Sequence, residues 1–329
     1  MGDANDGRQK AIIGNVDNDF WIFDSEKGFD LIRPSPPTAE PSQDAITVET
    51  TTAAITVDPA KSALVVIDMQ NFFLSPALGR PAGSKGSKAQ DQLLQHALPA
   101  ARKAGIQIAW VNWGLTDEDL ETMPPAVTRA FGFNAMTTDL FHRTYSTASP
   151  GSSELPSGTG PYQKDLWKDT EIYKGLGQPL GDVTLPDGSR IPAGRMLMRD
   201  QWNSQLTPAL LESYEASLKS AKPDVILDKL RMSGLHLPDS ASNKYFKQHG
   251  IKTLFFAGVN TDQCVNGTLL DAFAQGYDCI MLSDGCATTS PSAAQECVEF
   301  NSAKTTGFVV GCKGFAEGVE ASVSYRSSQ

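Results

Sequence analysis

Short apolar runs alternate with amphipathic stretches over two separate parts of the chain. Residues 63–67 are apolar at every position, which predicts a strand covered on both faces, as strands are in a parallel sheet. Residues 89–104 then carry apolar positions at helical spacing until Gly105, and residues 106–111 predict a second strand. A strand, a helix and a strand in this order predict a right-handed crossover between parallel neighbours.

The same alternation returns in the second half of the chain. Strands are predicted at 224–227, 252–257, 277–282 and 307–310, with helices at 239–249, before Gly276, and at 291–305. The total is about six parallel strands separated by helices. This pattern predicts a doubly wound α/β fold, a three-layer sandwich around a mostly parallel sheet.

Two segments lie outside this pattern. Residues 1–58 form an N-terminal extension, so the main domain spans 59–329. Within it, the alternation fails at about 112–222, a segment rich in aromatic residues, Gly and Pro. A structureless loop of that length is improbable inside a compact domain. We interpret it as an insertion after the second strand, with short elements such as a helix at 206–218, that forms part of an active-site lid.

The extension is mostly polar but contains an apolar island at 19–34, DFWIFDSEKGFDLIRP. Seven large apolar side chains in so short a stretch are too many to remain in water. We expect the island to dock on the main domain or on a second subunit, and we expect a homo-oligomer, either a dimer or a tetramer. The stretch at 38–57 is expected to be a linker or a weak edge strand.

Charge and composition exclude several partners. The net charge of −10 argues against binding to nucleic acid. No apolar run reaches membrane-spanning length, and the N-terminus shows no secretory h-region, so the expected location is the cytoplasm without membrane attachment. The sequence has neither a GxGxxG nor a GxxxxGK[ST] element, which argues against a nucleotide-binding enzyme. We expect no cofactor.

The cysteines and histidines give no metal-binding pattern. All five cysteines lie between Cys264 and Cys312 without a CxxC pair, and the four histidines are dispersed. An odd number of cysteines in this arrangement does not resemble a disulfide framework, and it lacks the ligand spacing of a zinc site. We therefore expect neither disulfide bonds nor a metal.

Three chemically useful residues fall at predicted strand ends: Asp68, Lys229 and Cys264. Cys264 lies in the first turn of a helix that directly follows a strand, where backbone N–H groups and the helix dipole favour a thiolate. Together the three would supply a base, a cation and a nucleophile, with backbone N–H groups nearby for an oxyanion hole. Taken singly, each also fits an ordinary structural role: a capping aspartate, a solvated lysine and an inert core cysteine.

Three motifs occur in the order found in one known family. They are LVVIDMQNFFL at 64–74, DKLRMSGL at 228–235 and GVNTDQCVNGTLLDAFAQGYDCIMLSDGCAT at 258–288. With them the sequence resembles the isochorismatase-like family of cysteine hydrolases, which includes isochorismatases, nicotinamidases, carbamoylsarcosine amidases and ureidoacrylate amidases. The resemblance covers the predicted sheet and leaves the extension and the insertion unmatched.

The resemblance implies a hydrolase and assigns roles. Asp68 would be the base, Lys229 the assisting cation and Cys264 the nucleophile. It also implies a cis peptide bond between Val259 and Asn260, so that the N–H groups of Asn260 and Cys264 would form the oxyanion hole.

Two departures from the family pattern narrow the function. Many members read DMQNDF, but here Phe72 and Phe73 follow Asn71, so the acidic residue is missing. Nicotinamidases carry an Asp/His metal cluster downstream of the first strand, whereas the segment that begins at Trp113 offers no histidine pair. A metal-dependent nicotinamidase is thus disfavoured.

Three functions remain open. The first is a cysteine amidase-type hydrolase that cleaves an amide, lactam or ureido C–N bond through a thioacyl-enzyme. The second is an isochorismatase, which hydrolyses a vinyl ether and needs an acid and a water but no thiol. The third is a non-enzymatic interaction module. The substrate would be a partly apolar small molecule, and its expected contacts are aromatic residues: Phe73, Trp113, Phe133 and Trp202.

Overall fold

A six-stranded sheet in which every neighbouring pair is parallel forms the centre of the molecule. The computed structural model describes residues 8–39, 44–131, 134–136 and 171–327 of the chain. The strands, in their spatial order, are β12 (Val225–Lys229), β7 (Gln107–Trp113), β6 (Ser62–Ile67), β13 (Thr253–Val259), β14 (Asp278–Ala287) and β15 (Phe308–Val310). The predicted fold class is confirmed.

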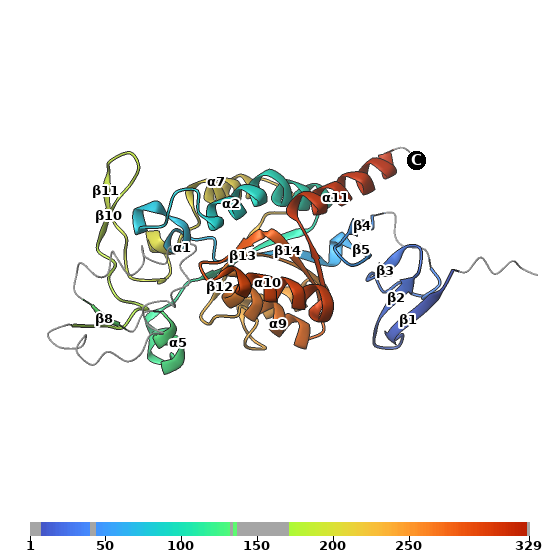
Figure 1. Cartoon of the computed structure of the whole chain (residues 1–329), viewed down its shortest axis with the longest axis horizontal. Helices are drawn as coiled ribbons and strands as arrows, with labels where there is room; N and C mark the ends of the chain where they lie inside the picture. Colours follow the sequence, from blue (N-terminus) through green and yellow to red (C-terminus); the bar gives the residue numbers. More distant parts are fainter. Residues whose placement is uncertain (1–7, 40–43, 132–133, 137–170, 328–329) are drawn as a thin grey trace, which may run out of the picture.

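Helices cover both faces of the sheet, as Figure 1 shows. The pleat of β6 explains why: Leu64 and Val66 point into one apolar cluster, while Val65 and Ile67 point into another. The first face is covered by α2 (Lys85–Gln92), η3 (Leu93–Ala97), α3 (Leu98–Ala104), α7 (Pro208–Ser217) and α11 (Cys312–Ser327). The second is covered by α8 (Ala241–Gln248), α9 (Asn266–Ala274) and α10 (Ser292–Asn301). The three-layer sandwich is therefore the observed architecture.

The strand β13 does not end where the sequence predicts. The predicted strand stops at residue 257, before Gly258, but β13 continues through this glycine to Val259. A Cβ atom at Gly258 would lie 2.0 Å from the carbonyl oxygen of Ile67, and its φ is +121°. The glycine is required by the close approach of β6 and by the left-handed backbone, not by a chain reversal.

The C-terminal helix α11 was not predicted. Its sequence contains two glycines and several serines, which lower helix propensity. A stripe of Phe315, Val319 and Val323 nevertheless repeats every four residues and packs against the first face of the sheet. That spacing is the signal that the sequence contained.

The N-terminal extension forms a sheet of its own, in the order β1-β2-β3-β5-β4. Its strands are β1 (Lys10–Asn15), β2 (Asp19–Asp24), β3 (Gly28–Asp30), β4 (Ile46–Glu49) and β5 (Ala54–Val57). The apolar island docks on the main domain of its own chain, where Trp21 and Phe29 pack against Phe308. Of the two expected docking sites, the main domain is therefore the observed one. The stretch at 44–57 holds two paired strands, with β4 at an edge, and is not a linker.

The insertion contains short elements and its own apolar cluster. They are α4 (Asp117–Glu121), α5 (Pro125–Ala130), β8 (Asn134–Met136), β9 (Glu171–Tyr173), β10 (Asp182–Thr184), β11 (Arg190–Pro192), η5 (Trp202–Ser204) and α7. The extension and the β10–β11 hairpin lie at opposite ends of the molecule (Figure 1). Phe133 and the segment 137–170 lie outside the described residues, and with them much of the predicted lid. In the described part of the chain, no helix has the length and apolar character needed to cross a membrane.

Candidate functional site

The three predicted catalytic residues meet at the carboxyl edge of the central sheet. Asp68 directly follows β6, and Lys229 is the last residue of β12. Cys264 lies in η6 (Thr261–Val265), a helical turn that follows β13 and leads into α9. Because the carboxyl ends of parallel strands share one edge, residues nearly two hundred positions apart in sequence come into contact.

Lys229 is the residue that joins the other two. Its Nζ lies 3.0 Å from Oδ2 of Asp68 and 3.6 Å from Sγ of Cys264. It also donates to the carbonyl oxygen of Arg231 at 3.1 Å and lies 4.0 Å from the ring centroid of Trp113. The side chain is 1% exposed. A lysine this deeply buried requires such partners, and the solvated-charge interpretation is excluded.

Asp68 is held by the backbone of β7. Its φ of 53° places it in the left-handed region, which is uncommon for a residue with a side chain and often occurs at functional sites. Its own N–H donates to Val111 O at 3.2 Å, and its Oδ1 accepts from Trp113 N–H at 3.3 Å. Burial raises the pKa of the Asp68 carboxyl, and the Lys229 ammonium opposes that rise. A carboxylate with a raised pKa is a stronger base.

Cys264 is buried as a neutral thiol. Burial raises its pKa to about 12, the charge of Asp68 adds to the rise, and the Lys229 ammonium opposes it. The thiolate expected from the helix terminus is therefore not the resting form. Desolvation of a buried sulfur outweighs the field of the first helical turn.

Met232 is a close neighbour of Cys264 that the sequence reasoning did not identify. Its Sδ lies 3.3 Å from the thiol sulfur of Cys264, in a position to accept the S–H hydrogen. Met232 belongs to the quoted motif DKLRMSGL, three positions after Lys229. The motif thus contained the residue, but nothing in its spacing shows that the loop turns back over the thiol.

Gln70 is a second residue that the reasoning missed. Its buried side chain accepts from the N–H of Trp113 at 3.2 Å and donates to the carbonyl oxygens of Trp113 and Ser204 at 2.7 Å and 2.6 Å. It thereby ties the end of β7 to the insertion beside the ion pair. Its place two residues after Asp68 in the motif is the signal that was available.

The predicted oxyanion-hole residue Asn260 follows a cis peptide bond after Val259, as the resemblance implied. It forms the N-cap of the helix that carries Cys264. Asn260 also lines a small cleft of about 40 Å³, together with Phe73 and Thr288. Phe73 therefore lies beside the predicted oxyanion hole.

The other aromatic candidates lie in different settings. Trp113 is 1% exposed, and its ring packs on Lys229 rather than on an open surface. Trp202 is half-buried in the apolar cluster of the insertion, and its carbonyl oxygen accepts from Asn71 at 2.9 Å. As substrate contacts, both remain predictions, and Phe133 lies outside the described residues.

No group of three or more His, Cys, Asp and Glu side chains arranged to hold a metal occurs among the described residues. The charged groups in contact at the site are one carboxylate and one ammonium, which neutralise each other. This pair can transfer a proton next to the sulfur of Cys264.

The family model of the isochorismatase domain matches residues 187–309. Over these residues the chain is similar to the isochorismatase domain. The matched segment includes Lys229, Asn260 and Cys264, while Asp68 lies before it and joins them through the sheet. The resemblance inferred from the motifs is thereby confirmed, and a hydrolase is supported.

Solved structures with the same fold include a cysteine hydrolase from Pseudomonas syringae pv. phaseolicola. It is 17% identical at a TM-score of 0.50, over 87% of this chain and 100% of that one. A nicotinamidase from Bacillus subtilis is 15% identical at a TM-score of 0.47, over 76% and 99%. An N-carbamoylsarcosine amidase from Thermoplasma acidophilum is 18% identical at a TM-score of 0.45, over 77% and 96%. At 17% identity, the likeness to the first structure concerns the fold.

Proposed function

We propose that this protein hydrolyses a carbon–nitrogen bond of a small amide, lactam or ureido compound through a thioacyl intermediate on Cys264. The observation that carries the proposal is the buried contact of Lys229 with both Asp68 and Cys264. An isolated ion pair of this kind is costly to bury and is weak evidence for stability alone. Next to the sulfur of Cys264, the ion pair could accept the thiol proton and offset negative charge on the sulfur.

In the first half of the reaction, Sγ of Cys264 adds to the substrate carbonyl carbon while its proton moves to Asp68. The high pKa of the thiol means that this proton leaves as the bond forms rather than beforehand. The N–H groups of Asn260 and Cys264 would stabilise the negative charge on the carbonyl oxygen. Asp68 then gives the proton to the departing nitrogen, and the C–N bond breaks.

In the second half, a water attacks the thioester and loses its proton to Asp68. The C–S bond breaks, and the proton returns to Cys264, which restores the resting site. Lys229 keeps Asp68 ionised between the two halves and offsets the charge that develops on sulfur. No step requires a metal or an organic cofactor.

The test begins with a hydrolysis screen of amides, lactams, carbamoyl compounds and isochorismate. On the best substrate, Cys264→Ala is expected to lower kcat by roughly four orders of magnitude or more, because the nucleophile itself is removed. The matched control is Cys297→Ala, which changes an exposed free cysteine. Intact-mass spectrometry of the wild type during turnover should show an acyl adduct that the Cys264 variant lacks.

Vinyl-ether hydrolysis gives the opposite result in the same experiment. Asp68 and a water would carry that reaction, so Cys264→Ala would keep most of its turnover and no adduct would form. An active Cys264→Ala enzyme on isochorismate therefore rejects the amidase proposal. Asp68→Ala is expected to be inactive under both reactions and therefore cannot distinguish them.

A further inference from the structure

A groove of about 690 Å³ lies between the N-terminal extension and the main domain. Its main-domain wall includes Asp278 and Phe308, the first residues of β14 and β15. The catalytic residues lie at the carboxyl edge of the same sheet, so the groove is at the opposite edge. It is a separate feature of the molecule and does not depend on the proposed reaction.

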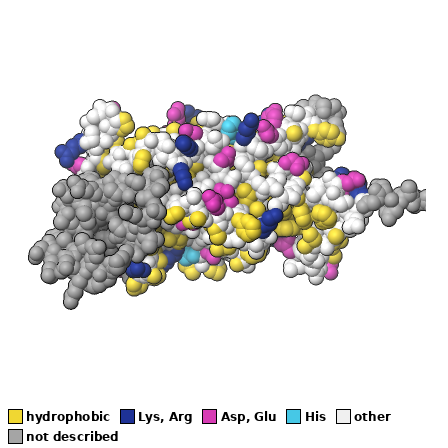
Figure 2. All heavy atoms as spheres, in the orientation of Figure 1, with side chains coloured by type: hydrophobic (Ala, Val, Ile, Leu, Met, Phe, Trp, Pro, Cys, Tyr) yellow, Lys and Arg dark blue, Asp and Glu magenta, His cyan; other side chains and the backbone are white. Residues whose placement is uncertain are grey.

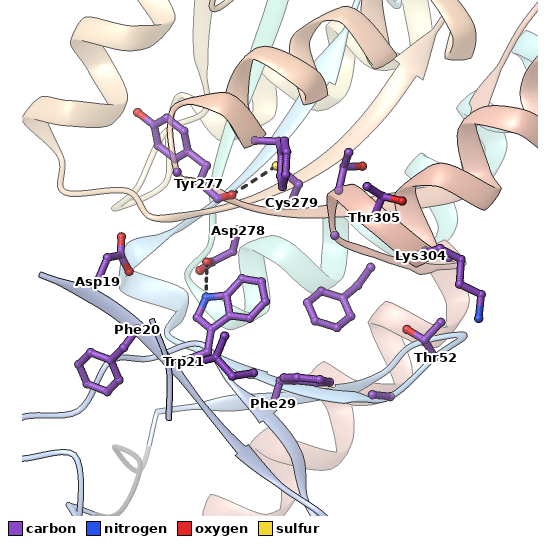
Figure 3. Close-up of a pocket in the computed structure, with 18 of the residues that line it drawn as sticks. Asp19, Phe20, Trp21, Phe29, Thr52, Tyr277, Asp278, Cys279, Lys304 and Thr305 are labelled. Carbon is purple, nitrogen blue, oxygen red and sulfur yellow. Dashed lines mark hydrogen bonds between the residues drawn. The ribbon is translucent and has the colours of Figure 1, made fainter. Parts of the chain in front are cut away.

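The groove has a rigid aromatic wall. The rings of Trp21 and Phe29 pack against Phe308 with centroid distances of 5.8 Å and 5.5 Å, and Figure 3 shows the two labelled rings lining the space. Trp21 is fixed by a 2.7 Å hydrogen bond from its indole N–H to Asp278. A groove of this size, apolar with a few polar groups and located between two structural units, has the features of small-molecule sites.

The charges at one end of the groove are already satisfied. Arg33 binds both oxygens of Asp278 at 2.6 Å and 2.8 Å and also contacts Asp19 at 2.5 Å. Thr253 donates to Asp278 at 2.8 Å, and Lys252 lies 3.7 Å from Asp19. These groups hold the extension in place and offer little to a ligand.

The other end holds an unused cation. Lys304 is exposed and makes no ion pair with any described residue. It lies with the hydroxyl groups of Thr52 and Thr305 on the side of the groove away from Asp19 and Tyr277 (Figure 3). Figure 2 shows apolar side chains gathered between the extension and the main domain, with basic side chains beside them. A positive group next to an aromatic wall is complementary to an organic anion, on a chain whose net charge is −10.

We propose that this groove binds a small organic carboxylate with an aromatic body, its ring stacked against Trp21 and Phe29 and its carboxylate at Lys304. Both walls would contact the ligand, so binding would strengthen the docking of the extension on the main domain. The site would act as a ligand-dependent clamp at the edge of the sheet away from the catalytic residues.

The probe for the test is 2-naphthoate, with the neutral 2-naphthylmethanol for comparison. Isothermal titration at low ionic strength is expected to give saturable 1:1 binding of 2-naphthoate with a Kd of about 1 mM or tighter. Lys304→Gln should weaken 2-naphthoate about fivefold and leave 2-naphthylmethanol unchanged, whereas Lys304→Arg should retain most of the affinity. Lys313→Gln, which alters an exposed lysine on α11, is the matched control.

A second variant tests the groove itself. Ala53 lines it, and Ala53→Trp would place a bulky ring in it and should weaken binding of both probes. Cys264→Ala should bind both probes as the wild type does, because its change lies at the other edge of the sheet. The proposal would be overturned if Lys304→Gln and Ala53→Trp bound 2-naphthoate as tightly as the wild type does. It would also be overturned if neither 2-naphthoate nor the smaller benzoate bound at concentrations up to about 5 mM, a range that covers weak ligands.

A second copy of the chain is the competing occupant, since Ile13 and Phe273 on the rim are 45% and 47% exposed. Sedimentation of the wild type and of Ala53→Trp separates the two cases. In the case of self-association, the wild type sediments as a dimer that becomes a monomer in Ala53→Trp and on addition of 2-naphthoate. That result would assign the groove to self-association and reject the carboxylate site. An unchanged mass in both proteins supports the ligand site.

Discussion

The thiol sulfur of Cys264 lies closer to the thioether of Met232, at 3.3 Å, than to the ammonium of Lys229, at 3.6 Å. A thioether accepts the S–H hydrogen but gives nothing to a thiolate, so this contact favours the neutral thiol. The lysine acts in the opposite direction. In addition to burial and the charge of Asp68, two neighbours with opposite preferences therefore act on the sulfur.

Replacing Met232 by Leu keeps the apolar volume and removes the acceptor. The thiol should lose part of its preference for the protonated form, so alkylation by iodoacetamide at neutral pH should become up to about fivefold faster. Met123→Leu is the control, because Met123 contacts Arg231 and not the thiol. A rate equal to that of the wild type would show that the sulfur–sulfur contact has no influence on the proton.

The acidic limb of the pH–rate profile should report Asp68. The base must be ionised to accept the thiol proton, and burial raises its pKa above the ordinary 3.8. Activity should therefore fall as the pH is lowered through a value above 3.8, while the fold remains intact by circular dichroism. A kcat/KM that stays constant down to pH 4 would assign the base to another group.

Lys229→Met should cost stability as well as activity. Its removal leaves the Asp68 carboxylate buried without a counter-ion, and such changes lower the free energy of unfolding by about 3 kcal/mol or more. Without the ammonium, the charge that opposes the effect of burial is gone, so the pKa of Asp68 rises further. Protonation then relieves the unpaired charge, and the stability deficit should shrink as the pH falls.

Urea denaturation at pH 7.5 and at pH 5.5 would measure this change. Lys244→Met is the control, because Lys244 is an exposed residue of α8. A deficit that is equal at both pH values would mean that Asp68 does not titrate in the variant.

Arg33→Ala should loosen the extension. The guanidinium binds the almost fully buried carboxylate of Asp278, and loss of one partner of such a pair costs about 3 kcal/mol. Limited proteolysis should then cleave the extension earlier than in the wild type. The control Lys27→Ala changes an exposed residue of the same segment.

A double-mutant cycle makes this test specific. If Arg33 acts through Asp278, then Arg33→Ala combined with Asp278→Asn should cost much less than the sum of the two single changes. Additive effects would mean that the two residues stabilise the extension independently.

The sequence predicted the sheet and the meeting of Asp68, Lys229 and Cys264 at one edge of it because both follow from local patterns. Continuous apolar runs indicated buried parallel strands, and each polar residue at a strand end lies at the shared edge of the sheet. Cys264, Lys229 and Asp68 came together for that reason. The helix after β13 placed Cys264 in its first turns as expected.

What the sequence did not predict depends on contacts between distant segments. The state of the thiol depends on how completely Cys264 is enclosed, which no local pattern expresses. The position of Met232 depends on the path of the loop after β12. A glycine at position 258 suggests a strand end when only the sequence is read. The sequence does not show that the backbone of Ile67 lies against Gly258 and leaves no room for a Cβ atom.

The ties between the extension and the main domain join residues made early with residues made late. Trp21 and Asp278 are 257 positions apart, and Arg33 and Asp278 are 245 apart. At typical synthesis rates, roughly 10–50 s pass between the synthesis of Trp21 and Arg33 and the synthesis of Asp278. During that interval the part of the main domain that contains Asp278 cannot yet cover the extension. The extension is thus made well before the surface that covers it, and its apolar face stays exposed to solvent until that surface is made.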